Sequence, residues 1–158
     1  MATVYLGLGS NEGDLETNIA RAYEEIEARI GKIISQSSLY YTEPWGFESP
    51  NKFINAVCAV ETFLSPHELL SFSQLIEREM GRKAKSHDGV YEDRIIDIDI
   101  LLYDNEVINM PDIVVPHPLM TKRAFVMQPL AEIAPSLRHP VLGDTIRHLY
   151  EALDESED

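Results

Sequence analysis

The 158-residue sequence predicts an α+β fold, in which an antiparallel sheet carries helices on one face. Two kinds of segment lead to this expectation: short runs with alternating or β-branched residues, and longer runs with apolar residues at helical spacing. The third observation is their order along the chain, which is β-α-β-β-α-β.

The first half of this pattern begins with a strand over residues 3–9, where apolar residues alternate with others. Residues 15–30 carry apolar side chains at helical spacing, and Gly31 is a suitable C-terminal stop. Residues 33–41 are rich in β-branched and aromatic residues and predict one continuous second strand.

The second half begins after an irregular loop at residues 43–52, which contains two prolines and a glycine. Residues 53–62 predict the third strand. Ser65 as N-cap and Glu68 three residues later form a capping box, so a helix is expected to begin here and to end at Gly81.

The chain then continues through a basic loop at residues 82–93 into a fourth strand at residues 95–103. A short strand near Val107 and helical segments after Arg123 and Asp144 form a C-terminal helical extension. Together these elements predict a ferredoxin-like βαββαβ unit with an extension, forming a single domain over residues 1–158.

Charge is unevenly distributed along the chain. The sequence has 13 Lys and Arg against 27 Asp and Glu, a net charge of −14, which argues against a nucleic-acid partner. Cations nevertheless gather in one short stretch: Arg78, Arg82, Lys83, Lys85 and Arg94. This stretch is expected to bind phosphate groups, the alternative being an ordinary solvated loop.

The sequence also bears on compartment and assembly. It has no run of eighteen apolar residues and no signal-peptide pattern at its start, so we expect no membrane partner. Its one cysteine, Cys58, cannot form an internal disulfide, which favours a reducing, cytoplasmic location. We expect a monomer.

Asp97 and Asp99 are the strongest candidate metal ligands. Strand alternation places both on one face, with isoleucines on the other. Their Cα atoms would be roughly 6.5 Å apart, which suits two Mg²⁺ ions that clamp the phosphates of a nucleotide. The alternative is an edge strand with a solvated acidic face, but the flanking isoleucines favour a central, buried strand.

Other candidates would bind phosphate or a flat ring. Arg94 lies three residues before Asp97 and can grip phosphate oxygens with its planar fork. Phe53 and Asn55 share a strand face, an arrangement that can hold a polar heterocycle, although such an aromatic is more often part of the core. Thr42, Trp45 and Phe125 could complete that pocket, and His117 with Arg123 forms a second possible phosphate-binding group.

Several motifs, taken in chain order, carry a family resemblance. They are Gly9-Ser10-Asn11, Tyr41-Thr42-Glu43-Pro44-Trp45-Gly46, Phe53-Ile54-Asn55-Ala56, Glu77 with Gly81-Arg82, Asp93-Arg94-Ile95-Ile96-Asp97-Ile98-Asp99-Ile100-Leu101, Val115-Pro116-His117-Pro118 and Arg123-Ala124-Phe125. In this order they resemble the 6-hydroxymethyl-7,8-dihydropterin pyrophosphokinases of folate biosynthesis. One departure is Tyr91-Glu92-Asp93, where the family usually has Trp-Gly-Pro.

The resemblance implies a reaction and a role for each matching residue. The family transfers the pyrophosphoryl unit of ATP to the hydroxymethyl group of a reduced pterin and releases AMP. By this likeness Asp97 and Asp99 hold two Mg²⁺ ions, and Arg82 and Arg94 stabilise the transferring group. Contacts to ATP are implied for Gln74, Glu77, Lys85, Arg94, Ile100, His117 and Arg123, and contacts to the pterin for Thr42, Pro44, Trp45, Phe53, Asn55, Tyr91 and Phe125.

Two other functions remain open from the residues alone. A nucleotidyltransferase also combines a Gly-Ser turn with an acidic pair on a strand, but its Gly-Ser normally lies close before that pair, unlike Gly9-Ser10 here. A regulatory module of the same fold would bind a small ligand without turnover. The products discriminate, because AMP supports pyrophosphoryl transfer and free pyrophosphate supports nucleotidyl transfer.

Overall fold

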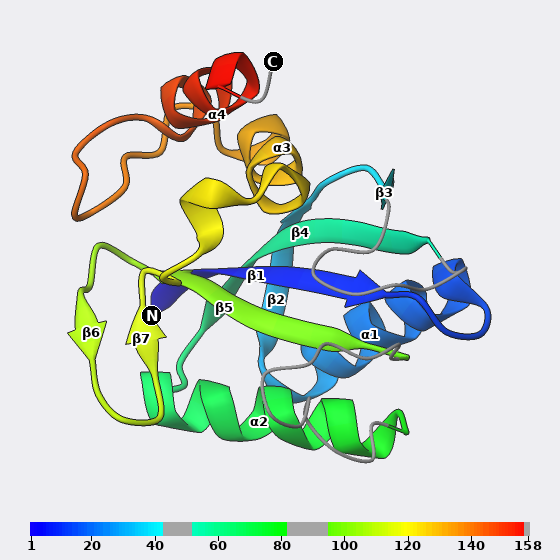
Figure 1. Ribbon diagram of the computed structural model, residues 1–158. Helices are drawn as coiled ribbons and strands as arrows, with labels where there is room; N and C mark the ends of the chain where they lie inside the picture. The colour runs from blue at the N-terminus through cyan, green and yellow to red at the C-terminus, as the bar shows by residue number, and fades with distance from the viewer. Residues whose placement is uncertain (43–51, 82–94, 157–158) are drawn as a thin grey trace.

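The computed structural model describes residues 1–42, 52–81 and 95–156. Its elements in chain order are β1 (Ala2–Ser10), α1 (Leu15–Arg29), β2 (Gly31–Gln36), β3 (Tyr40–Thr42), β4 (Phe53–Thr62), α2 (Pro66–Glu79), β5 (Asp97–Tyr103), β6 (Ile108–Asn109), β7 (Val114–Val115), the 3₁₀ turn η1 (Met120–Lys122), α3 (Ala124–Ile133) and α4 (Ile146–Ser156). The main sheet has the order β2-β4-β1-β5, and β3 pairs with β4 (Figure 1). All its strand pairs are antiparallel, which confirms the α+β class.

The predicted strand at residues 33–41 is wrong as one element, because it forms β2 and β3 with a break between them. Ser37 causes the break. Its hydroxyl accepts a hydrogen bond from the Val57 N–H at 2.9 Å and donates to the Ser38 carbonyl at 2.8 Å. A side chain thus replaces one ladder bond, and β2 and β3 pair separately with opposite ends of β4.

Both ends of α2 lie close to where the sequence predicted them. The Ser65 hydroxyl accepts from the Glu68 N–H at 3.2 Å, and the Glu68 carboxylate accepts from the Ser65 N–H at 2.9 Å, so the predicted capping box is confirmed. At the other end Met80 is the C-cap, and Gly81 follows with a φ of 107°. A positive φ suits glycine, which explains why the helix stops there.

Helices cover both faces of the sheet. One core joins α1 and α2 to the alternating apolar residues of β1, together with residues of β4 and β5. A second core lies on the other face, where Val57, Leu101 and Leu102 pack against α3 and α4 (Figure 1). The helical extension therefore turns what would be an open sheet face into the walls of a possible site.

The strand that carries the aspartates is at the edge of the sheet, so the predicted central position of β5 is wrong. Its isoleucines are nevertheless buried in the core with α1 and α2, and other groups satisfy the outer backbone edge of the strand. The Glu77 carboxylate on α2 accepts from the Ile98 N–H at 2.7 Å, and the His117 N–H donates to the Leu101 carbonyl at 3.0 Å. Local sequence shows that a strand is buried, but not whether a strand or a side chain satisfies its outer edge.

No helix in residues 1–42, 52–81 and 95–156 is long and apolar enough to cross a membrane.

Candidate active site

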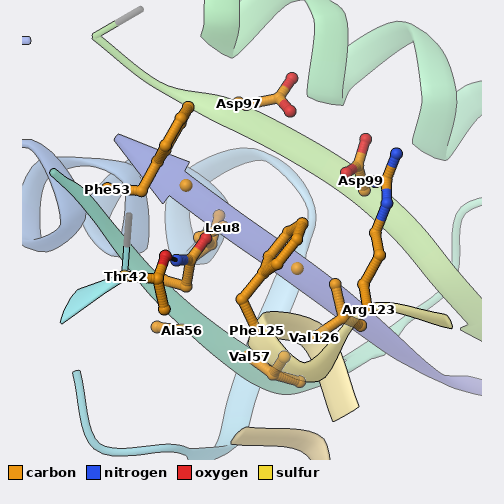
Figure 2. Close-up of a pocket in the computed structure, with 13 residues that line it drawn as sticks. Leu8, Thr42, Phe53, Ala56, Val57, Asp97, Asp99, Arg123, Phe125 and Val126 are labelled. Atoms are coloured by element: carbon orange, nitrogen blue, oxygen red, sulfur yellow. Dashed lines mark hydrogen bonds between the residues drawn. The ribbon is translucent and has the colours of Figure 1, made fainter. Parts of the chain in front are cut away.

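A pocket of about 620 Å³, counting space open to solvent, lies on the face of the sheet that α3 covers. Its floor comes from β1 and β4, and its walls come from β3, β5 and the start of α3 (Figure 2). The lining residues are Gly7, Leu8, Gly9, Thr42, Phe53, Asn55, Ala56, Val57, Asp97, Asp99, Arg123, Phe125 and Val126. Seven of these were predicted as site residues from the sequence: Thr42, Phe53, Asn55, Asp97, Asp99, Arg123 and Phe125.

Two glycines of β1 keep the floor open. Gly9 is paired with Asn55 on one side and with Asp97 on the other, and Gly7 is paired with Asp99. A Cβ atom at Gly9 would lie 3.4 Å from the Asn55 Oδ1 and 3.8 Å from the Phe53 ring, in the space a ligand needs. Because residues opposite each other in a ladder point to the same face, the glycines leave a shallow trough between the amide and the carboxylates.

Gly7 was missed from the sequence, and Gly9 was noted only as part of a turn. The available signal was their two-residue spacing, which matches that of Asp97 and Asp99 and puts both glycines on one strand face. Their importance appears only with the register, which sets each glycine opposite an aspartate.

The aspartates occupy one end of the trough. Both carboxylates are half-buried, and Figure 2 shows them on the same face of β5, with Arg123 extending toward Asp99. The described residues contain no group of three or more His, Cys, Asp or Glu side chains that could hold a metal. A pair suits Mg²⁺ all the same, because this ion is usually bound by one or two carboxylates together with the phosphates of a substrate.

The opposite end of the trough is aromatic. Phe53 from β4 and Phe125 from α3 stand on either side of it (Figure 2). Between them the Asn55 Nδ2 donates to the Thr42 hydroxyl at 2.8 Å, and the Asn55 side chain is buried. This bond uses the amide nitrogen and leaves the carbonyl oxygen directed toward the floor at Gly9, as an acceptor for a ring N–H.

Arg123 joins the two ends of the pocket. Its side chain is buried, and its guanidinium carbon lies 5.6 Å from the centroid of the Phe125 ring, within the range of a cation–π contact. Because the ring and the charge are two positions apart at the start of α3, the same short segment supplies an aromatic wall and a cation beside the carboxylates.

His117 lies beside this cation and is half-buried. Burial, with a further contribution from the positive charge of Arg123, lowers its pKa, against an opposing influence of Asp97. Its Nδ1 accepts a hydrogen bond from the Leu119 N–H at 3.2 Å. The ring is therefore neutral near pH 7, with its proton on Nε2, and this N–H is suited to donate to a phosphate oxygen.

Four described residues predicted for ATP do not line the pocket: His117, which lies beside it, and Ile100, Gln74 and Glu77. The Ile100 side chain is buried in the core on the opposite face, so only its backbone could meet a nucleotide. Gln74 and Glu77 lie on α2, and Glu77 is the buried carboxylate that accepts from the Ile98 N–H. Six further predictions, Pro44, Trp45, Arg82, Lys85, Tyr91 and Arg94, lie outside the described residues.

Replacing Glu77 tests its contact with β5. In Glu77→Ala the Ile98 N–H would remain buried without this acceptor, and we expect the free energy of unfolding to fall by about 1–3 kcal/mol. Glu77→Gln retains a carbonyl acceptor and should lose less. Urea denaturation followed by circular dichroism measures both, and equal stability of wild type and Glu77→Ala would contradict the structural role.

Known proteins are similar to this chain in sequence and in fold. Residues 5–135 match the family model of 7,8-dihydro-6-hydroxymethylpterin-pyrophosphokinase (HPPK). A 2-amino-4-hydroxy-6-hydroxymethyldihydropteridine pyrophosphokinase of Porphyromonas gingivalis is 50% identical over 141 residues, which cover 89% of this chain and 95% of that protein. The protein of the same name from Aquifex aeolicus is 46% identical, with 89% and 86% covered.

Solved structures support the architecture. A Plasmodium falciparum HPPK-DHPS chain superposes with a TM-score of 0.79 over 96% of this chain at 20% sequence identity, a likeness that concerns the fold alone. The present chain spans about 44% of the length of that longer chain. The family match covers most of the sequence, and the curated relatives are matched over nearly their full length. This chain belongs to the 7,8-dihydro-6-hydroxymethylpterin-pyrophosphokinase family.

Proposed function

We propose that this protein transfers the pyrophosphoryl group of ATP to 6-hydroxymethyl-7,8-dihydropterin, giving AMP and the pterin diphosphate, a step in folate biosynthesis. Family membership and the shared name of its close relatives support the reaction. The single structural observation that carries it is the trough that joins an aromatic–amide end to a carboxylate end across Gly9.

The pterin ring would bind at the aromatic end. Phe53 and Phe125 offer faces for stacking, and the Asn55 carbonyl oxygen would accept from a ring N–H. Thr42 fixes the orientation of that amide. Pro44, Trp45 and Tyr91 are proposed to complete this end, on the strength of the family motifs alone.

The hydroxymethyl group would then point along the trough toward the aspartates. Asn55, Gly9 and Asp97 are paired across three adjacent strands, so the amide and the carboxylate are separated by two interstrand spacings, roughly 9.5 Å. A bicyclic ring with a one-carbon arm bridges such a gap. The arm would thus be held beside the place where phosphates bind.

ATP would bind with its phosphates at the carboxylate end. Asp97 and Asp99 would hold two Mg²⁺ ions, which neutralise phosphate charge when bound. Arg123 and the neutral His117 would contact phosphate oxygens from the side of α3 and β7. Arg82 and Arg94 are proposed to stabilise the transferring group, and Lys85, Gln74, Glu77 and Ile100 to contact ATP, in keeping with the family resemblance.

The chemical step takes place at one phosphorus atom of the transferred pyrophosphoryl group. The hydroxymethyl oxygen forms a bond to the β-phosphorus of ATP, the bond from that phosphorus to the oxygen bridging to the α-phosphate breaks, and the hydroxyl proton is released. AMP leaves with the former bridging oxygen. The protein's side chains act by positioning both substrates and by stabilising charge. These two effects account for most of the catalysis of phosphoryl transfer.

We further propose a single, monomeric, cytoplasmic domain over residues 1–158, with a ferredoxin-like unit and a helical extension. The strand order β2-β4-β1-β5 supports this fold class, and the two cores share strands β4 and β5, which supports one domain.

The proposed function is tested by incubating the protein with ATP, MgCl₂ and 6-hydroxymethyl-7,8-dihydropterin and separating the nucleotides by chromatography. We expect AMP to form in equal amount to the pterin diphosphate, to stop when EDTA removes the metal, and to resume when Mg²⁺ is added back. Free pyrophosphate as the product would favour nucleotidyl transfer instead. Turnover that is unaffected by EDTA would contradict the proposed metal site.

A further inference from the structure

Glu132 makes an unusual set of contacts near the far end of α3. Its carboxylate accepts from the Ser38 N–H at 2.9 and 3.2 Å, from the Ser38 hydroxyl at 2.9 Å and from the Tyr40 hydroxyl at 2.7 Å. These donors belong to the segment between β2 and β3 and to β3 itself. One exposed side chain therefore joins the helix to a strand more than ninety positions earlier in the sequence.

The two ends of α3 contribute to different walls of the pocket. Phe125 and Glu132 are seven positions apart, which places them on one face of the helix and roughly 10.5 Å apart along its axis. Phe125 forms one aromatic wall, while Glu132 holds the segment that leads into the opposite wall at Thr42. The stretch of α3 between them, which includes Pro129, is packed in the second core through Val126, Met127 and Leu130, so the Glu132 carboxylate relates the place of β3 to that of Phe125.

The position of β3 also affects the Asn55 amide, which is proposed to bind the pterin ring. Tyr40 is paired with Asn55, and Thr42 is paired with Phe53. The Thr42 hydroxyl also accepts from the Asn55 amide, so a displacement of β3 would release the orientation of that amide. β3 has only three residues and, within the part of the chain that the structure describes, pairs with β4 alone, which makes it the least supported strand of the pocket.

We infer that Glu132 is a positioning residue that sets the width of the pterin-binding end of the pocket by tying α3 to Ser38 and Tyr40. This inference deepens the proposed function and rests on it. In these contacts the Glu132 carboxylate keeps its charged form. Although burial opposes it, hydrogen bonds from Tyr40 and Ser38 lower the pKa of Glu132, and the same contact with Glu132 raises the pKa of Tyr40 to about 12.

Steady-state kinetics with the full chain test the inference. In Glu132→Gln one oxygen is replaced by an NH₂ group that cannot accept, so part of the tie is lost while the volume is kept. We expect the KM for the pterin to rise about tenfold, the size of effect expected for hydrogen bonds to a charged group, with kcat and the KM for ATP changed less than about twofold. Tyr40→Phe removes one of the bonds and should raise the pterin KM about threefold.

Tyr41→Phe is the matched control. The Tyr41 hydroxyl donates to Glu16 on α1 at 2.8 Å, a bond of the same kind from the same strand but toward the other face of the sheet. It does not involve α3, so its loss should leave the pterin KM unchanged within about twofold if spacing from α3 is what matters.

The outcomes separate the inference from the proposed function. A wild-type protein that forms no AMP would refute the function. With an active wild type, an unchanged pterin KM in Glu132→Gln would overturn the positioning role. So would a parallel rise of the KM for ATP with a fall in melting temperature, since that indicates general loosening. An equal effect of Tyr41→Phe would also overturn it, because β3 rigidity and not its spacing from α3 would then be responsible.

Discussion

Asp97→Ala and Asp99→Ala are each expected to lower kcat by about 10³-fold, because each would remove a carboxylate from the proposed metal pair at the point where phosphate charge changes. Both side chains are half-buried on the pocket face and belong to neither core. The fold should therefore remain, with circular dichroism and melting temperature close to those of wild type. The assay measures AMP at saturating ATP and pterin over a range of Mg²⁺ concentrations.

The control for these variants is Glu106→Ala. Glu106 is an exposed acid that follows the same strand and lies outside the pocket. Its replacement by alanine therefore removes one negative charge without changing a residue of the site. It should retain wild-type kcat. Activity within tenfold of wild type in both aspartate variants would show that the pair does not hold the catalytic metal ions.

Phe125→Ala is expected to raise the KM for the pterin about 10- to 100-fold, because stacking of a heterocycle on an aromatic side chain contributes about 1–3 kcal/mol. The KM for ATP should change less, since the ATP phosphates are proposed to bind at the aspartates of β5, whereas Phe125 faces the trough from α3 (Figure 2). Initial rates measured against each substrate in turn give the two constants separately.

Two further variants identify the cause of that loss. Phe125→Leu keeps an apolar side chain against the second core but removes the ring, so it should reproduce most of the rise in KM with little loss of stability. Phe63→Ala removes a phenylalanine that is 86% exposed outside the pocket and should have no effect. A pterin KM that is normal in Phe125→Leu would show that the ring does not stack on the substrate.

Much of the fold is local in origin and was predictable for that reason. The capping box of Ser65 and Glu68, the stop at Gly81 and the alternation along β1 depend on residues a few positions apart. The break at Ser37 was not predictable in this way, since it depends on a hydroxyl meeting the Val57 N–H twenty residues away. A pattern rich in β-branched residues indicates extended backbone but not where its ladder is interrupted.

The candidate site can likewise be divided into features that depend on nearby residues and features that depend on distant ones. Alternation along one strand was sufficient to place Asp97 and Asp99 on a common face, and the ordered motifs gave the family and with it the proposed partners of that pair. The sequence by itself thus determined the chemistry that the chain can carry. It did so because strand periodicity and motif spacing are properties of neighbouring residues.

Only the tertiary structure decided how those residues meet. It set Gly7 and Gly9 opposite the aspartates, put β5 at the edge of the sheet under the carboxylate of Glu77, and brought Glu132 to Tyr40. Each of these contacts joins residues that are distant in the chain. Register and edge position come from pairing between strands and from packing of helices on them, and no local pattern encodes either.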